Sequence, residues 1–158
     1  MRYFLLDKIT HVEPGKKVQG IKCVTLTDQI LHDHFPDKPI MPGALILEGC
    51  AQLAGFLLET TANRPGKKLR RAVLAQADKF KFHKFCEPGD TIEMKVEIVS
   101  QHEDMAQVQA EASVQGEKRV GGLLNFALLE IDNQNITNQR LQMYRIWTRD
   151  LKNCPELM

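Results

Sequence analysis

Three residues between positions 34 and 48 have the types and spacing that acid–base chemistry at a carbonyl compound needs. His34 is the side chain best suited to act as a base at neutral pH. Glu48 lies in an otherwise apolar stretch, where a carboxyl group tends to keep its proton, as a general acid must. Gly43 begins that stretch, and the free N–H groups of a helix start can polarise a carbonyl oxygen. Together they suit removal of an α-proton beside a thioester carbonyl.

Each of these features also has a plain structural interpretation. Glu48 could form a structural ion pair with an arginine or lysine, and its helix alone does not decide between the two readings. A loop histidine such as His34 usually has no special role.

Gln52 lies one helical turn after Glu48, so its amide could hydrogen-bond the carboxyl group and orient it. Prolines at 36, 39 and 42 stiffen the loop between His34 and the helix, which favours a fixed relation between the two groups.

The element that must position Glu48 is a long helix. From Gly43 to about Ala62 apolar residues occur on every side, which is typical of a helix buried all round. Residues 63–66, Asn-Arg-Pro-Gly, contain the glycine and proline that end a helix.

The rest of the chain up to residue 131 alternates between apolar and polar residues, as strands do. We therefore predict an α+β fold in which an antiparallel sheet of about six strands curls around the helix. Residues 1–131 would form this domain, and residues 132–158 a C-terminal extension with a short amphipathic helix, packed on the domain or on a partner subunit. The expected strands are Tyr3–His11, Val18–Leu26, Ala72–Phe85, Thr91–Ser100, Met105–Val114 and Arg119–Ile131.

The composition excludes several classes of protein. A net charge of +1 gives no global attraction to nucleic acid or to a membrane. No run of about 18 apolar residues is evident, so we expect no membrane-spanning segment and a cytoplasmic protein. The 4 cysteines have neither zinc-like spacing nor the pattern of a disulfide framework. His32 and His34 lack an evident third ligand, so we predict no metal, and we expect no cofactor.

The segment around these residues resembles the 3-hydroxyacyl-[acyl-carrier-protein] dehydratases. The match consists of His34-Phe35-Pro36, Pro39-Ile40-Met41-Pro42-Gly43, Leu45, Glu48 and Ala51-Gln52, and the likeness extends over roughly residues 3–131. The chain departs from the family at Asp33, where glycine is common, and at Gly49, where alanine is usual. The bifunctional dehydratase–isomerase branch typically has aspartate in place of Glu48, so the chain is more similar to the non-isomerising branch.

The resemblance implies a hot-dog fold and reversible dehydration of (3R)-hydroxyacyl thioesters on acyl carrier protein to trans-2-enoyl thioesters, in fatty-acid or specialised lipid or polyketide synthesis. His34 would take the α-proton, Glu48 would protonate the leaving hydroxyl, and the N–H of Gly43 would bind the thioester carbonyl. It also implies a homodimer, or a hexamer built as a trimer of dimers, in which His34 of one chain meets Glu48 of the other. The further residues expected to bind substrate are Gln52, Phe35, Met41 and Pro42.

A run of basic residues precedes and follows the start of the third expected strand. Such a run is usually just a solvated face, but the family docks its acidic carrier on basic residues near this strand. The candidate docking residues are Lys79, Lys81, Lys84, Arg70 and Arg71. Two other functions stay open: a hot-dog acyl thioesterase, and a non-catalytic acyl-binding subunit.

Overall fold

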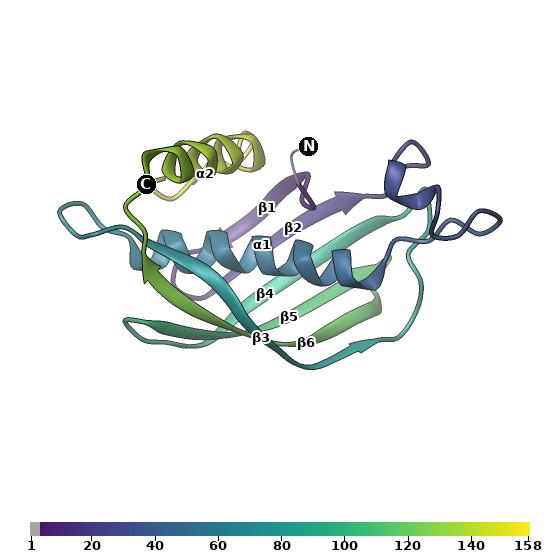
Figure 1. Cartoon of the computed structure of the whole chain (residues 1–158), viewed down its shortest axis with the longest axis horizontal. Helices are drawn as coiled ribbons and strands as arrows, with labels where there is room; N and C mark the ends of the chain where they lie inside the picture. Colours follow the sequence, from purple (N-terminus) through teal and green to yellow (C-terminus); the bar gives the residue numbers. More distant parts are fainter. Residues whose placement is uncertain (1–3) are drawn as a thin grey trace.

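The computed structural model describes residues 4–158, which fold as one antiparallel sheet wrapped around one long helix (Figure 1). The sheet has 6 strands in the order β1-β2-β4-β5-β6-β3, and every neighbouring pair is antiparallel. The predicted α+β hot-dog arrangement is therefore confirmed. The elements in chain order are β1 (Lys8–Glu13), β2 (Lys17–Cys23), a 3-10 turn η1 (Gln29–Leu31), α1 (Gly43–Ala62), β3 (Arg70–Phe82), β4 (Thr91–Gln101), β5 (Met105–Val114), β6 (Glu117–Glu130) and α2 (Gln134–Trp147).

Helix α1 is the centre of the core. It is buried along most of its length because its apolar side chains face the sheet on one side and α2 on the other. The strands alternate as period-two elements should, with Ile92, Met94 and Val96 of β4 facing inward and their neighbours facing solvent. This packing holds α1 rigidly, so side chains on α1 have fixed positions relative to the sheet.

The N-terminal segment differs from the expected strand. We predicted extended structure from Tyr3 to His11, but strand pairing begins at Lys8, and Tyr3 lies outside the described residues. Residues 4–7 instead pack on α1, with Leu5 and Leu6 almost completely buried. The Leu6 side chain lies against Gly20 of β2 and the Leu5 backbone lies against Gly49 of α1, and a strand pattern does not distinguish such packing from strand pairing.

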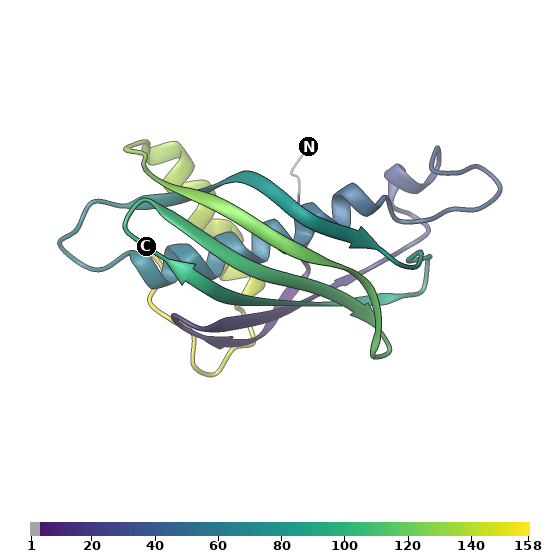
Figure 2. The same ribbon diagram turned by 90° about the horizontal axis from the view of Figure 1, so that it is seen from below.

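Helix α2 packs on the side of α1 that faces away from strands β3–β6 (Figures 1 and 2). Asn133 caps its start by accepting hydrogen bonds from the backbone N–H groups of Asn135 and Ile136. Its buried face consists of Met143, Tyr144 and Trp147. The fold therefore has three layers at this end, with the sheet, α1 and α2 in succession.

Candidate active site

The loop before α1 holds the His34 ring in one orientation. The backbone N–H of Ile40 donates to the His34 carbonyl at 2.8 Å, and Phe35 and Lys38 exchange two backbone hydrogen bonds across the same turn. The His34 Nδ1 lies 3.1 Å from the carbonyl oxygen of Ile40. Because a carbonyl oxygen can only accept, Nδ1 carries the hydrogen in this bond and Nε2 keeps its lone pair in the neutral ring. The half-buried ring therefore presents a basic nitrogen.

The first turn of α1 offers backbone donors. Pro42 precedes the helix, and its carbonyl accepts from the N–H groups of Leu45 and Ile46. Within residues 4–158 the N–H groups of Gly43 and Ala44 have no recorded acceptor, as expected for the first residues of a helix. The ring of Phe82 covers Gly43, and a Cβ at this position would lie 2.6 Å from the ring. A larger residue here would have to displace the exposed Phe82 ring, so glycine leaves the backbone donors directly under that ring.

Glu48 is half-buried in the second turn of α1, and an amide holds it. Gln52 Nε2 donates to Glu48 Oε1 at 3.0 Å, as the spacing of one helical turn predicts. Gln52 Oε1 in turn accepts from the backbone N–H of Leu5 at 3.1 Å. No ion pair to Glu48 is recorded in the part of the chain that the structure describes, so the structural ion-pair interpretation of Glu48 is not supported.

The other residues expected to bind substrate have different environments. Phe35 is 53% exposed and stacks on the His34 ring, with 4.5 Å between the ring centroids. Met41 is buried in the core, and its backbone N–H donates to the Cys86 carbonyl. Within residues 4–158 neither a hydrogen bond nor an ion pair joins His34 to Glu48. The two side chains of one chain are thus held separately, each by its own hydrogen bond.

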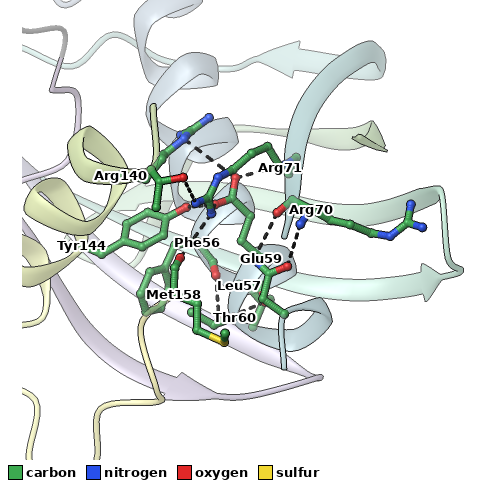
Figure 3. Close-up of polar contacts among 12 residues, drawn as sticks. Phe56, Leu57, Glu59, Thr60, Arg70, Arg71, Arg140, Tyr144 and Met158 are labelled. Atoms are coloured by element: carbon green, nitrogen blue, oxygen red, sulfur yellow. Dashed lines mark hydrogen bonds and ion pairs between the residues drawn. The ribbon is translucent and has the colours of Figure 1, made fainter. Parts of the chain in front are cut away.

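A second carboxylate on α1 escaped the sequence analysis. Glu59 is 1% exposed, and its carboxylate lies 3.0 Å from the guanidinium of Arg71. The Arg71 side chain is also 1% exposed. The Tyr144 hydroxyl donates to Glu59 at 2.7 Å, and the backbone N–H of Ala72 donates to it at 3.1 Å. Arg140 approaches the same carboxylate at 3.9 Å, so β3 and α2 both contribute to the cluster (Figure 3). Burial and the Glu59 charge hold the pKa of Tyr144 well above its usual value.

This cluster corrects the prediction for Arg71. We expected Arg71 to dock an acidic carrier, but its guanidinium is buried and donates to Glu59, to Thr137 and to the main-chain oxygen of Met158. A group with these partners and no exposed surface cannot meet a partner protein. Arg70 is partly exposed and paired with Glu103 and Glu130. The exposed candidates are Lys79, Lys81 and Lys84, the last of which pairs with Glu117.

The cysteines nearest the candidate site are not nucleophiles. Burial raises the pKa of the Cys50 thiol to about 12, and that of the Cys86 thiol to about 11. Both thiols therefore stay protonated at neutral pH. In the described range, residues 4–158, no group of three histidine, cysteine, aspartate or glutamate side chains could hold a metal ion.

Helix α1 bears on the prediction about membrane segments. By length and composition it could cross a membrane, with a mean hydropathy of 1.2, but the core helix of a soluble protein meets the same criteria. In this chain, 67% of its most apolar window is buried inside the protein, where it forms the core of the domain.

Comparison with known proteins identifies the family. The model of the FabA-like domain matches residues 1–120. A 3-hydroxyacyl-[acyl-carrier-protein] dehydratase FabZ of Clostridioides difficile is 39% identical over 128 residues, which are 81% of this chain and 88% of that protein. A FabZ of Acetivibrio thermocellus is 36% identical over 135 residues, 84% of this chain and 88% of that protein. The chain belongs to the FabA-like 3-hydroxyacyl-[acyl-carrier-protein] dehydratase family.

Solved structures support the fold of this family member. A chain of the dehydratase heterocomplex ApeI:P from Xenorhabdus doucetiae matches with a TM-score of 0.68 and 19% identity, covering 87% of this chain and 88% of that one. A hypothetical thioesterase with coenzyme A from Streptococcus pneumoniae matches with a TM-score of 0.63 and 14% identity, covering 80% of this chain and 88% of that one. At such low identity these structures establish only a shared fold.

Proposed function

We propose that this dehydratase-family protein catalyses reversible dehydration of (3R)-hydroxyacyl thioesters on acyl carrier protein to trans-2-enoyl thioesters in fatty-acid biosynthesis, in the cytoplasm. The observation that carries the proposal is the environment of Glu48. This carboxyl group lies on the core helix, is held by a neutral amide and has no cationic partner among residues 4–158. A carboxyl group free of a permanent ion pair can exchange a proton with a substrate.

The proposed mechanism uses one proton acceptor and one proton donor. His34 Nε2 takes the α-proton of the substrate, and the electron pair of that C–H bond forms the carbon–carbon double bond. The bond from the β-carbon to its hydroxyl breaks, and Glu48 supplies the proton with which the hydroxyl leaves as water. The N–H groups at the start of α1, at Gly43, stabilise the charge that develops on the thioester oxygen. Transfer of a proton from His34 back to Glu48 through water restores both groups.

A second copy of the chain would complete the site, with His34 of one chain facing Glu48 of the other. Strand β3 is an edge strand of the sheet and carries exposed apolar side chains, including Val73 at 41% and Phe82 at 55%. An exposed edge of this kind is a natural surface for pairing with another strand. This contact would build the dimer, and a hexamer formed as a trimer of dimers would need a second interface.

Mixing two inactive variants tests this shared site. Co-expressed His34→Ala and Glu48→Gln chains form mixed dimers in which one site has both functional groups. Because half of the random dimers are mixed and each has one intact site of two, we expect about a quarter of wild-type activity. If both groups of a site came from one chain, the mixture would stay inactive, which would contradict the shared site.

The assay for the reaction itself follows enoyl formation from (3R)-hydroxyacyl carrier protein, together with release of free thiol. We expect enoyl product without thiol release. Thiol release without enoyl product would favour a thioesterase, and tight binding without either product would favour an acyl-binding subunit.

Carrier docking would use the exposed lysines Lys79, Lys81 and Lys84, with a smaller contribution from the ion-paired Arg70. Lys81→Glu should lower kcat/KM several-fold for a carrier-bound substrate at low salt, because local charge accelerates encounter. The same variant should be unchanged on a small thioester without carrier. Lys152→Glu, an exposed lysine in the C-terminal extension, is the matched control. An equal loss in both lysine variants would contradict docking at β3.

A further inference from the structure

We propose that residues 4–8, held by the C-terminal extension (residues 132–158), fix the orientation of the Gln52 amide and thereby decide which oxygen of Glu48 carries the proton. This inference rests on the proposed function, in which Glu48 is the acid. It assigns a role to two segments that touch the site only indirectly, and it makes Gln52 a positioning residue.

The first step is the hydrogen bond from Leu5 to Gln52. A backbone N–H can only donate, so the Gln52 atom that faces Leu5 at 3.1 Å is the oxygen. The amide nitrogen is then the atom that faces Glu48 Oε1 at 3.0 Å. That carboxyl oxygen accepts a hydrogen bond, so the proton of the neutral acid is on Oε2, the oxygen left for a substrate.

A flipped amide would have the opposite effect. The Gln52 oxygen would then face Glu48 and would accept a hydrogen bond from a proton on Oε1. Such a proton would be held by the protein instead of being available to a leaving hydroxyl. The Leu5 N–H would meanwhile face an NH₂ group, and two donors in contact repel one another. The position of Leu5 therefore selects the productive orientation.

The second step is the tight packing of Leu5 against α1. A Cβ on Gly49 would lie 2.8 Å from the Leu5 carbonyl oxygen and 2.7 Å from Met94 Cε. The backbone of residues 4–8 can approach the helix this closely only because position 49 is glycine. Gly49 follows Glu48 directly and is one of the two positions where the sequence departs from the family pattern. The glycine that departs from the family pattern is thus the residue that permits the close contact with Leu5.

The third step is the contact of residues 4–8 with the C-terminal extension. The rings of Phe4 and Trp147 meet edge to face, with centroids 6.3 Å apart. Arg149 Nη1 donates to the Asp7 carbonyl at 3.0 Å. A salt bridge of 2.7 Å joins Lys8 to Asp150. Residues 4–8 are therefore enclosed between α1 and the end of α2, which lies beside them in Figure 1.

The extension itself is anchored to the same helix that carries Glu48. Tyr144 packs edge to face against Phe56 of α1, with centroids 5.1 Å apart, and donates to Glu59. Trp147, one turn further along α2, is 1% exposed. The family match ends at residue 120, before α2 begins. The anchored extension thus lies beyond the matched residues, and its end reaches the segment that orients Gln52.

The test is a double-mutant cycle between the segment and the amide. Phe4→Ala removes the ring that Trp147 contacts, and we expect kcat to fall about tenfold at unchanged KM, the effect of one hydrogen bond lost in the transition state. In the Gln52→Leu background, Phe4→Ala should cost nothing further, because the amide through which it acts is gone. Ile98→Ala on β4, another partly buried apolar side chain, is the control for a general loss of stability.

Gly49→Ala is the alternative test variant if Phe4→Ala does not fold. It gains helix propensity, which offsets part of the cost of pushing the Leu5 carbonyl away, so kcat should again fall. A ¹⁵N spectrum should show the Gln52 side-chain amide signal shifted in both variants and unchanged in Ile98→Ala. Additive losses in the cycle, or an unmoved amide signal, would overturn the inference. A wild-type protein without dehydratase activity would instead refute the proposed function.

Discussion

Helix α1 carries two carboxylates with different surroundings. Glu59, at the C-terminal end, is buried and receives hydrogen bonds from Arg71, Tyr144 and the backbone of Ala72. Glu48, in the second turn, is half-buried and receives one from the amide of Gln52. The first has a permanent counter-charge, and the second has none among residues 4–158. A carboxylate with a complete set of fixed partners stabilises the fold, whereas one with an available oxygen can exchange protons.

The largest expected effect separates the two carboxylates by activity. Glu48→Gln keeps the shape and the contact with Gln52 but cannot donate a proton, so kcat should fall about 10²- to 10⁴-fold. The thermal midpoint should stay within about 2 °C of the wild type, since no ion pair is lost. Turnover on a hydroxyacyl carrier protein and a thermal melt measure the two quantities. Turnover close to that of the wild type would mean that Glu48 is not the acid.

The next effect separates them by stability. Glu59→Leu leaves the Arg71 guanidinium buried without its counter-charge, so the free energy of unfolding should fall by about 3–5 kcal/mol. Urea denaturation measures this loss. The fraction that remains folded should keep most of its kcat, because Glu59 lies near the opposite end of the helix from Gly43. A stable Glu59→Leu protein would show that the buried pair does not hold the fold.

Removing both charges sharpens the comparison. The double variant Glu59→Leu/Arg71→Met replaces the pair by apolar side chains and leaves no unpaired charge. We expect it to recover at least half of the stability lost in Glu59→Leu, since the cost of the single variant arises from the orphaned cation. A double variant as unstable as the single one would show that the cost comes from lost packing instead.

The smallest effect concerns Tyr144. Tyr144→Phe removes one hydrogen bond to Glu59 and should cost about 1.5–3 kcal/mol at neutral pH. Because the folded protein raises the pKa of Tyr144, this residue keeps its proton when folded but loses it above about pH 10 when unfolded. The contribution of Tyr144 is therefore fully present below pH 10 and declines as the pH rises further. Urea denaturation of both proteins across this range should show the gap narrowing.

Much of the fold followed from local patterns. The helix was predicted from Gly43 to about Ala62 and has those bounds, because an apolar run of this length between proline and an Asn-Arg-Pro-Gly segment has few alternatives. The strands were found with ends displaced by a few residues, as for β3, which begins at Arg70 instead of Ala72. Hydrophobic alternation places a strand but does not define where its pairing stops.

The candidate site was likewise predicted only in part. The hydrogen bond between Gln52 and Glu48 was expected from helical spacing and is present. The burial of Arg71 was not expected, because a basic residue at the start of an edge strand normally faces solvent. Its partners Glu59, Thr137 and Met158 come from three distant parts of the chain. The signal that could have found it was Glu59 itself, a second carboxylate on an apolar helix.

The sequence alone determined the core helix, the wrapped sheet, the family and the residues that could donate or accept protons, since these depend on composition, spacing and short motifs. Only the tertiary structure decided which carboxylate is paired and which is available. It also decided that Leu5 reaches Gln52 and that the C-terminal extension lies beside residues 4–8. Such contacts join segments far apart in the chain, and they depend on how side chains pack in three dimensions, which no local pattern encodes.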